Sequence, residues 1–112
     1  MKSIVRPWGT IFQIVCRKRF AINIIKIEAF QRLSLQSHQF RDELWILVAQ
    51  KSVVEVAANK IISGIINFVW IQKNVRHRLK SMRNPVYFLE LALGEYSLDD
   101  IIRYEDDYNR IV

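Results

Sequence analysis

Short apolar stretches alternate with polar turns along almost the whole chain. Isoleucine, valine and phenylalanine dominate these stretches, and β-branched and aromatic residues favour strands. No helical period persists until the last residues, where 98–108 are expected to form a short turn or helix. The predicted strands cover residues 10–16, 20–28, 33–38, 43–49, 52–56, 61–63, 68–71, 76–80 and 86–93.

The spacing of the turns predicts the fold class. Turn signals recur at short, regular intervals between the strands, a pattern typical of an antiparallel sandwich or barrel. A chain of 112 residues, of which 51% are hydrophobic, is long enough for one core and too apolar to be disordered. We therefore expect an all-β fold in which residues 1–112 form a single domain.

Charge and cysteine content limit the partners. The net charge of +6 raises the question of nucleic acid, but apart from Arg17-Lys18-Arg19 the basic residues are scattered, without interleaved aromatic platforms. No apolar run reaches the length of a membrane span or signal peptide. The single cysteine, Cys16, excludes an internal disulfide and is expected to be buried filler. These features predict a cytoplasmic protein with no nucleic-acid or membrane partner.

One short segment that begins at Gln36 concentrates the chemistry of the chain. Gln36 and His38 are two residues apart, so on a β-strand they project from the same face. Glu43 follows a polar turn, and a hairpin there brings it back opposite His38. The only other histidine, His77, also lies in a strand-like setting. Amide, imidazole and carboxylate groups that converge on one point suit Zn²⁺, Mn²⁺, Fe²⁺ or Co²⁺.

The spacing of these residues resembles the two motifs of the cupin superfamily. The first motif, Gly-x5-His-x-His-x4-Glu-x6-Gly, aligns with Phe30-x5-Gln36-x-His38-x4-Glu43-x6-Gln50. The second, Gly-x5-Pro-x-Gly-x2-His-x3-Asn, falls on Gln72-x-Asn74-x2-His77-x3-Ser81, without the glycines, the proline and the closing asparagine. The resemblance implies a cupin, a small antiparallel β-barrel or jelly-roll sandwich. It also implies one divalent metal held by Gln36, His38, Glu43 and His77.

Three linked motifs make the resemblance more specific. In chain order they read Arg6-Pro7-Trp8-Gly9, Arg32-Leu33-Ser34-Leu35-Gln36-x-His38 and Asp99-Asp100-Ile101-Ile102-Arg103-Tyr104-Glu105-Asp106-Asp107-Tyr108-x-Arg110. They are similar to the type II mannose-6-phosphate isomerase domain, the cupin found at the C-terminus of bifunctional mannose-1-phosphate guanylyltransferases. The resemblance covers nearly the whole chain. The glycine-rich nucleotide loop of the guanylyltransferase is absent, so nucleotidyl transfer by this chain alone is not expected.

The chain departs from this family at three positions near the predicted ligands. Gln39, Phe40 and Leu44 stand where the family often has histidine. These replacements are expected to thin the polar lining of the pocket and therefore favour a weakened or altered activity.

The resemblance implies interconversion of mannose 6-phosphate and fructose 6-phosphate. This isomerisation moves a proton between C1 and C2 through an enediolate, so it needs a base and charge stabilisation at two oxygens, which a metal supplies as a Lewis acid. Arg41 or Arg78 is expected to bind the phosphate or the developing oxyanion. No base can be identified from the sequence.

Three further arginines, Arg6, Arg32 and Arg103, are candidate substrate-binding residues. For Arg6 and Arg103, ion pairs with the acidic run Glu105-Asp106-Asp107 are an equal alternative, and that run is otherwise expected to be a solvated face.

Two other classes stay open. The chain can be a non-catalytic sugar-phosphate or nucleotide-sugar binding cupin, accessory to a separate guanylyltransferase, or a degenerate structural dimer. A homodimer is expected in any case, because an apolar face around Ile24, Leu33 and Leu35 needs cover and the N-terminal strand can exchange between subunits.

Overall fold

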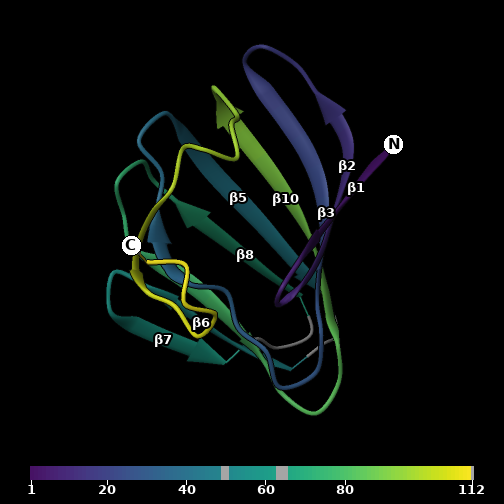
Figure 1. The fold of residues 1–112 in the computed structure, drawn as a ribbon, viewed down its shortest axis with the longest axis vertical. Helices are drawn as coiled ribbons and strands as arrows, with labels where there is room; N and C mark the ends of the chain where they lie inside the picture. Colours follow the sequence, from purple (N-terminus) through teal and green to yellow (C-terminus); the bar gives the residue numbers. More distant parts are fainter. Residues whose placement is uncertain (49–50, 63–65, 112) are drawn as a thin grey trace.

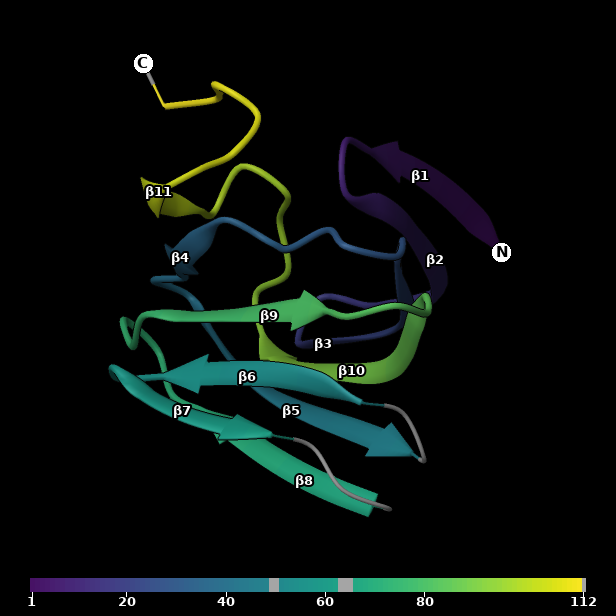
Figure 2. The ribbon, with the colours of Figure 1, turned by 90° about the horizontal axis from the view of Figure 1, so that it is seen from below.

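The chain folds into two antiparallel β-sheets, seen here in a computed structural model that describes residues 1–48, 51–62 and 66–111. The larger sheet has the strand order β1-β2-β3-β10-β5-β8 and the smaller one β11-β4-β9-β6-β7. Figure 1 shows β3, β10, β5 and β8 running side by side, and in Figure 2 β4 and β11 continue the smaller sheet towards the C-terminus. The strands are β1 (Lys2–Arg6), β2 (Gly9–Cys16), β3 (Phe20–Ile27), β4 (Leu35–Ser37), β5 (Arg41–Val48), β6 (Ser52–Val56), β7 (Asn59–Ile62), β8 (Ile66–Ile71), β9 (His77–Ser81), β10 (Val86–Gly94) and β11 (Ile102–Glu105).

Strict alternation of side chains creates the core between the two sheets. Every second residue of β3, β5 and β10 is buried, as expected for strands with one face against a core. Trp45, Leu47 and Phe88 face inward from the larger sheet, and Val54 and Leu79 meet them from the smaller one. The all-β prediction is confirmed, and this core fixes which residues of each strand can reach a buried site.

Nine of the predicted strands are present, with their ends shifted by a few residues. Ala49 and Ser63, at the ends of two predicted strands, lie outside the described residues, as does Gln50 of the first motif. Two strands were not predicted, β1 and β11. β11 occupies the segment expected to be a turn or helix, with turns before and after it. The described part of the chain contains no helix, and so none long enough to span a membrane.

Three expectations about burial need correction. Cys16 is exposed, because it ends β2 beside the basic tip, beyond the core. Leu33 and Leu35 are buried rather than part of an open apolar face. Ile24 does point outward, because the alternation of β3 buries Ile25 instead.

The Arg-Pro-Trp-Gly motif closes the turn between β1 and β2 against the core. Trp8 is buried, and its carbonyl oxygen accepts a hydrogen bond from the backbone N–H of Glu28. Gly9 has φ of 156°, and a Cβ there would overlap the carbonyl oxygen of Lys26 on β3. Glycine is required because the two backbones approach too closely for any side chain.

Candidate metal site and adjoining cavity

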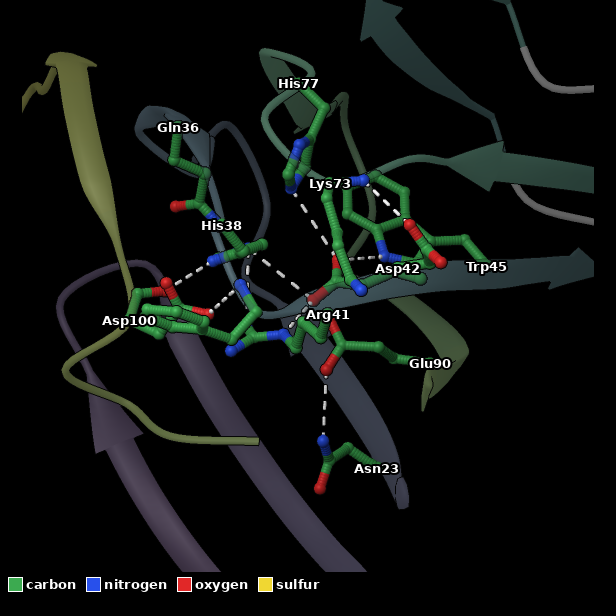
Figure 3. A network of polar contacts seen from close by, with 12 residues as sticks. Asn23, Gln36, His38, Arg41, Asp42, Trp45, Lys73, His77, Glu90 and Asp100 are labelled. Carbon is green, nitrogen blue, oxygen red and sulfur yellow. Dashed lines mark hydrogen bonds and ion pairs between the residues drawn. The ribbon is translucent and has the colours of Figure 1, made fainter. Parts of the chain in front are cut away.

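The candidate ligands come from both sheets and meet between them. Glu43 points inward from β5, and His77 begins β9 on the opposite sheet. Gln36 pairs with His77 across the β4–β9 ladder, and His38 follows β4 directly. Figure 3 shows Gln36, His38 and His77 close together at this point. The turn before β5 brings Glu43 next to His38, as expected, but β4 and β5 belong to different sheets and do not pair, so the predicted hairpin between them is wrong.

His38, Glu43 and His77 form a compact, buried cluster. The Nε2 atom of His38 lies 3.5 Å from Oε2 of Glu43, and Nε2 of His77 lies 3.6 Å from Oε1. One ligand atom from each residue falls within 4.8 Å of the others. The exposed fraction of all three side chains is 4% or less. Two imidazoles and a carboxylate at this spacing form a donor set that suits a divalent transition metal.

The hydrogen bonds of the two histidines orient their Nε2 atoms towards Glu43. Nδ1 of His38 lies 2.7 Å from the carbonyl oxygen of Asp100, and Nδ1 of His77 lies 2.9 Å from that of Val75. A carbonyl only accepts, so each Nδ1 carries the proton and each Nε2 offers a lone pair, the arrangement usual for metal-binding histidine. Nε2 of His77 is buried and finds no hydrogen-bond partner in the part of the chain that the structure describes. These residues therefore fit a metal ion.

Burial sets the protonation states of the cluster. It lowers the pKa of His38 to about 4 and also lowers the pKa of His77, so that the neutral imidazole is favoured. Burial alone raises the pKa of Glu43, but His38, His77 and Arg41 outweigh it and the pKa is lowered overall. The cluster is thus two neutral nitrogen donors and one carboxylate, the forms that bind metals.

Gln36 lies beside the cluster with its amide oxygen turned away. Its Nε2 atom is 3.5 Å from Nε2 of His38, and its Oε1 accepts a 2.7 Å hydrogen bond from the Ser34 hydroxyl. A half-turn of the amide would direct Oε1 to the cluster, and Ser34 could then accept from the amide NH₂ instead. Gln36 is therefore placed to become a fourth ligand.

Arg41 is built into the cluster. Its Nε donates to Oε2 of Glu43 at 2.8 Å, and one Nη lies 3.3 Å from Nε2 of His38. Its other Nη donates to the carbonyl oxygen of Ser97. Trp45 is fully buried and donates from its indole N–H to Oε1 of Glu43 at 3.1 Å. Both carboxylate oxygens of Glu43 are therefore held in place by neighbours on the same strand.

The structure does not bring Arg32 and Arg78 to this site. Arg32 makes a two-pronged ion pair with Asp107, at 2.6 and 2.8 Å. Arg78 donates to the carbonyl oxygen of Leu33 and to Glu105. The ion pairs with the acidic run, expected as an alternative for Arg6 and Arg103, are made instead by these two residues and by Arg110, which pairs with Asp106.

A cavity adjoins the cluster and is rich in arginine. Arg6 and Arg103 line it, as does Arg110, which the sequence reasoning did not single out. Arg103 faces Gln36 across the β11–β4 ladder, and its Nε atom is buried with no hydrogen-bond partner within residues 1–48, 51–62 and 66–111. Burial lowers the pKa of Arg103, and Arg110 and Arg6 lower it further, whereas Asp106 raises it. Asp106 is not a solvated residue, since both of its carboxylate oxygens bind Arg110.

One buried carboxylate that lines the cavity, that of Glu90, was not predicted from the sequence. Glu90 lies on β10 opposite Trp45, lines the cavity and accepts a 3.0 Å hydrogen bond from the amide of Asn23 (Figure 3). Burial, with Glu43 nearby, raises the pKa of Glu90 to about 8. A signal was present in the sequence, because the alternation of β10 places Glu90 in line with the core residues Phe88 and Ala92. A carboxylate at a core position of a strand needs a structural or functional explanation.

The family departures lie outside the cluster. Gln39 and Phe40 are exposed in the turn, where their backbone N–H groups donate to the Asp100 carboxylate. Leu44 faces away from the core. Their replacement of histidine therefore leaves the cluster and its ligand atoms unchanged.

Two packed antiparallel sheets with a His–Glu–His cluster between them define this protein as a cupin. The family model described as "Mannose-6-phosphate isomerase C-terminal" matches residues 1–106, and the chain belongs to this family.

Relatives of the chain occur among longer bacterial proteins. It is 33% identical over 111 residues to the xanthan biosynthesis protein XanB of Xanthomonas campestris pv. campestris, covering 97% of this chain and 24% of XanB. It is 29% identical over 112 residues to the mannose-1-phosphate guanylyltransferase ManC of Salmonella typhimurium, covering 98% and 23%. The chain thus spans about a quarter of the length of these relatives.

Solved structures support the fold. The capsular polysaccharide assembling protein CapF of Staphylococcus aureus has a TM-score of 0.79 at 11% identity, over 94% of this chain and 34% of CapF. KdgF from Halomonas sp. has a TM-score of 0.75 at 11% identity, over 86% and 90%. At this level of identity, both comparisons support the shared fold alone.

Proposed function

We propose that this chain is a metal-dependent isomerase domain that interconverts mannose 6-phosphate and fructose 6-phosphate in sugar-nucleotide biosynthesis. The observation that carries the proposal is one cavity that joins two kinds of binding group. Gln36 and His38, of the candidate ligand set, line it together with Arg6, Arg103 and Arg110. A phosphorylated sugar needs both, because its hydroxyl and carbonyl oxygens bind a metal while its phosphate needs cations.

The metal would be held by His38, Glu43 and His77, with Gln36 as a fourth ligand. When bound, it would supply Lewis-acid stabilisation to the oxygens on C1 and C2 of the sugar. The metal can be Zn²⁺, Mn²⁺, Fe²⁺ or Co²⁺, since all of them accept this donor set.

The arginines would hold the phosphate. Arg103 has an N–H group without an acceptor among the residues that the structure describes, and the positive charges of Arg110 and Arg6 are near enough to lower its pKa. A phosphate dianion would supply the missing acceptor and relieve this repulsion. Arg41, which lines the same cavity beside His38, is placed to donate to the negative charge that develops on the sugar oxygen.

Glu90 is our candidate for the base. Its carboxylate would remove the proton from C2 of the open-chain aldose. The C–H electron pair would form the C1=C2 bond, and the carbonyl electrons would move onto O1. The protonated Glu90 would then deliver a proton to C1 while the O2 proton passes to O1, which leaves the ketone at C2. Asn23 supports both states of Glu90, because its NH₂ donates to the carboxylate as observed and its unpartnered Oδ1 could accept from the acid after an amide turn.

The size of the cavity adds one requirement. It measures about 80 Å³, which is room for a few water molecules and less than a sugar phosphate needs. Leu98 is 38% exposed and lines the cavity. Entry of a hexose phosphate would therefore require Leu98 and its neighbours in the 98–101 segment to move outward.

A coupled assay tests the proposal. The protein is loaded with Zn²⁺, Mn²⁺ or Co²⁺, its metal content is measured, and interconversion of the two hexose phosphates is followed in both directions. We expect turnover that disappears with a chelator and returns with metal. Binding of mannose 6-phosphate without any turnover would reject the isomerase.

A non-catalytic sugar-phosphate or nucleotide-sugar binding cupin is the second candidate. The observation that favours it is the position of Arg41. Its Nε–H group donates to a carboxylate oxygen of Glu43, and one of its Nη atoms lies close to Nε2 of His38, so both ligand atoms already face a cation. A guanidinium in this position supplies a positive charge without a metal. This candidate predicts unchanged sugar-phosphate binding after metal removal, whereas the isomerase predicts a loss of turnover.

A further inference from the structure

A turn of the chain at residues 97–100 presents two backbone carbonyl groups to the His–Glu–His cluster. The turn is closed by a 3.2 Å hydrogen bond from the Asp100 N–H to the carbonyl oxygen of Ser97. The same Ser97 oxygen accepts from Arg41 at 3.0 Å, and the Asp100 carbonyl oxygen lies 2.7 Å from Nδ1 of His38 (Figure 3). Because a carbonyl group only accepts, the turn holds Arg41 and Nδ1 of His38 as donors.

The Asp100 side chain fixes this turn to the segment that carries His38. One of its carboxylate oxygens accepts from the backbone N–H of Gln39 at 2.8 Å, and the other accepts from that of Phe40 at 3.0 Å. Asp100 is therefore bonded to three consecutive residues, 38–40. Since its carboxylate anchors it to the two residues after His38, its own carbonyl group is held at the His38 ring.

The backbone of His38 has a second support that does not involve Asp100. Its carbonyl oxygen accepts a 2.7 Å hydrogen bond from the N–H of Asn74. The ring, in contrast, depends on Asp100 for its tautomer. If Nδ1 lost its acceptor, the proton could move to Nε2, because Oε2 of Glu43 lies 3.5 Å from that atom and can accept. In this second tautomer Nε2 has no lone pair to offer a metal.

We propose that Asp100 is a positioning residue for the metal site. Its carboxylate sets the place of its carbonyl group, and the carbonyl group keeps the His38 proton on Nδ1, so that Nε2 stays free to bind. The inference rests on the metal site of the proposed function and adds a residue that acts through His38. Loss of a partner that orients a metal-binding histidine lowers metal affinity by about 10- to 100-fold.

Nuclear magnetic resonance of the metal-free chain tests the tautomer without any metal or turnover. Long-range ¹H–¹⁵N spectra at neutral pH identify which ring nitrogen carries the proton. The chain has only two histidines, and His77 is an internal reference because its Nδ1 faces Val75. We expect Nδ1–H in both rings of the wild type. In Asp100→Ala we expect the Nε2–H form to appear in His38 alone.

Calorimetric titration with Zn²⁺ measures the consequence for binding. Asp100→Ala should lose about 10- to 100-fold in affinity. Asp99→Ala is the matched control, because Asp99 is the exposed neighbour with the same charge, and it should bind Zn²⁺ like the wild type. Asp100→Asn should fall between Asp100→Ala and the wild type, since its amide oxygen can accept from one of the two N–H groups while its NH₂ cannot.

Two results would overturn the proposal. One is an unchanged His38 tautomer in Asp100→Ala, and the other is an equal loss of Zn²⁺ affinity in Asp99→Ala. A wild type that binds no Zn²⁺ would reject the metal site of the proposed function, and the tautomer alone would then decide whether Asp100 positions His38. Far-UV circular dichroism shows whether the variants fold. If Asp100→Ala does not fold, Asp100→Asn provides the same comparison.

Discussion

Nε2 of His77 lies 3.6 Å from Oε1 of Glu43 and has no hydrogen-bond partner among the described residues, although both side chains are almost completely buried. A neutral imidazole cannot donate from this atom, since its proton is on Nδ1 facing the Val75 carbonyl oxygen. Two electron-rich atoms therefore face each other, and a bound cation would satisfy both of them. This relationship is the strongest structural reason to expect a metal.

Replacing His77 should abolish metal binding with limited damage to the fold. His77→Ala removes a ligand whose Nε2 makes no hydrogen bond, so we expect at least about a 100-fold loss of Zn²⁺ affinity and a cost of about 1–3 kcal/mol from the space left behind. Metal content and the rise of the melting temperature with added Zn²⁺ measure the change. Asp107→Asn, which removes a carboxylate outside the cluster, should keep both. Full metal content in His77→Ala would contradict the proposed ligand set.

Removing the charge of Arg103 should weaken binding of the phosphate specifically. A hydrogen bond to a charged group contributes about 1.5–3 kcal/mol, so Arg103→Gln should raise the Kd for mannose 6-phosphate by about 10- to 150-fold. Calorimetry measures this, with free mannose as a comparison that should be unaffected. Arg32→Gln is the matched control, because Arg32 is held by Asp107 away from the cavity. An equal loss of affinity for mannose 6-phosphate in both variants would contradict a role of Arg103 in binding the phosphate.

Glu90→Gln should stop proton transfer while metal and substrate still bind. The amide has the shape of the carboxyl group but cannot accept the C2 proton, so we expect at least about a 100-fold fall in turnover. Exchange of the C2 hydrogen in D₂O, followed by NMR, should fall in parallel, whereas metal content and the Kd for mannose 6-phosphate stay the same. Retained exchange would show that another group is the base. A wild type without turnover or exchange would reject the isomerase itself.

The stability of the metal-free protein should depend on Glu90 through pH. Burial raises the pKa of Glu90 to about 8, above the ordinary value of 4.5, so the neutral acid is favoured in the folded state. A carboxyl group with a raised folded pKa destabilises the fold progressively as the pH rises from the unfolded pKa towards the folded one. The melting temperature of Glu90→Gln, relative to wild type, should therefore be higher at pH 8 than at pH 5. An unchanged difference between the two pH values would contradict this assignment.

The local pattern of the sequence was enough to predict most strands and part of the site. Alternation in β3 and β10 identifies their buried faces, and the two-residue spacing of Gln36 and His38 places both on one side of the chain. The polar turn before Glu43 predicted that Glu43 returns to His38, but not that this turn crosses from the smaller sheet to the larger one instead of closing a hairpin. The residues at which the strands begin and end could be predicted less well, because they depend on the neighbouring strands with which each strand pairs. β1 and β11 were missed because short edge strands form only where a neighbouring strand supplies their hydrogen bonds.

Only the tertiary structure determined the contacts between residues that are far apart in the sequence. Whether an arginine faces the cavity or the acidic run depends on which strands pair. β11 pairs with β4, so Arg103 lies beside Gln36, while Arg32 and Arg78 are taken by Asp107 and Glu105. Glu90 joins the site because β10 lies between β3 and β5, next to Asn23 and Trp45. Spacing along one strand determines the face of each side chain, but the order of strands in the two sheets determines which faces meet.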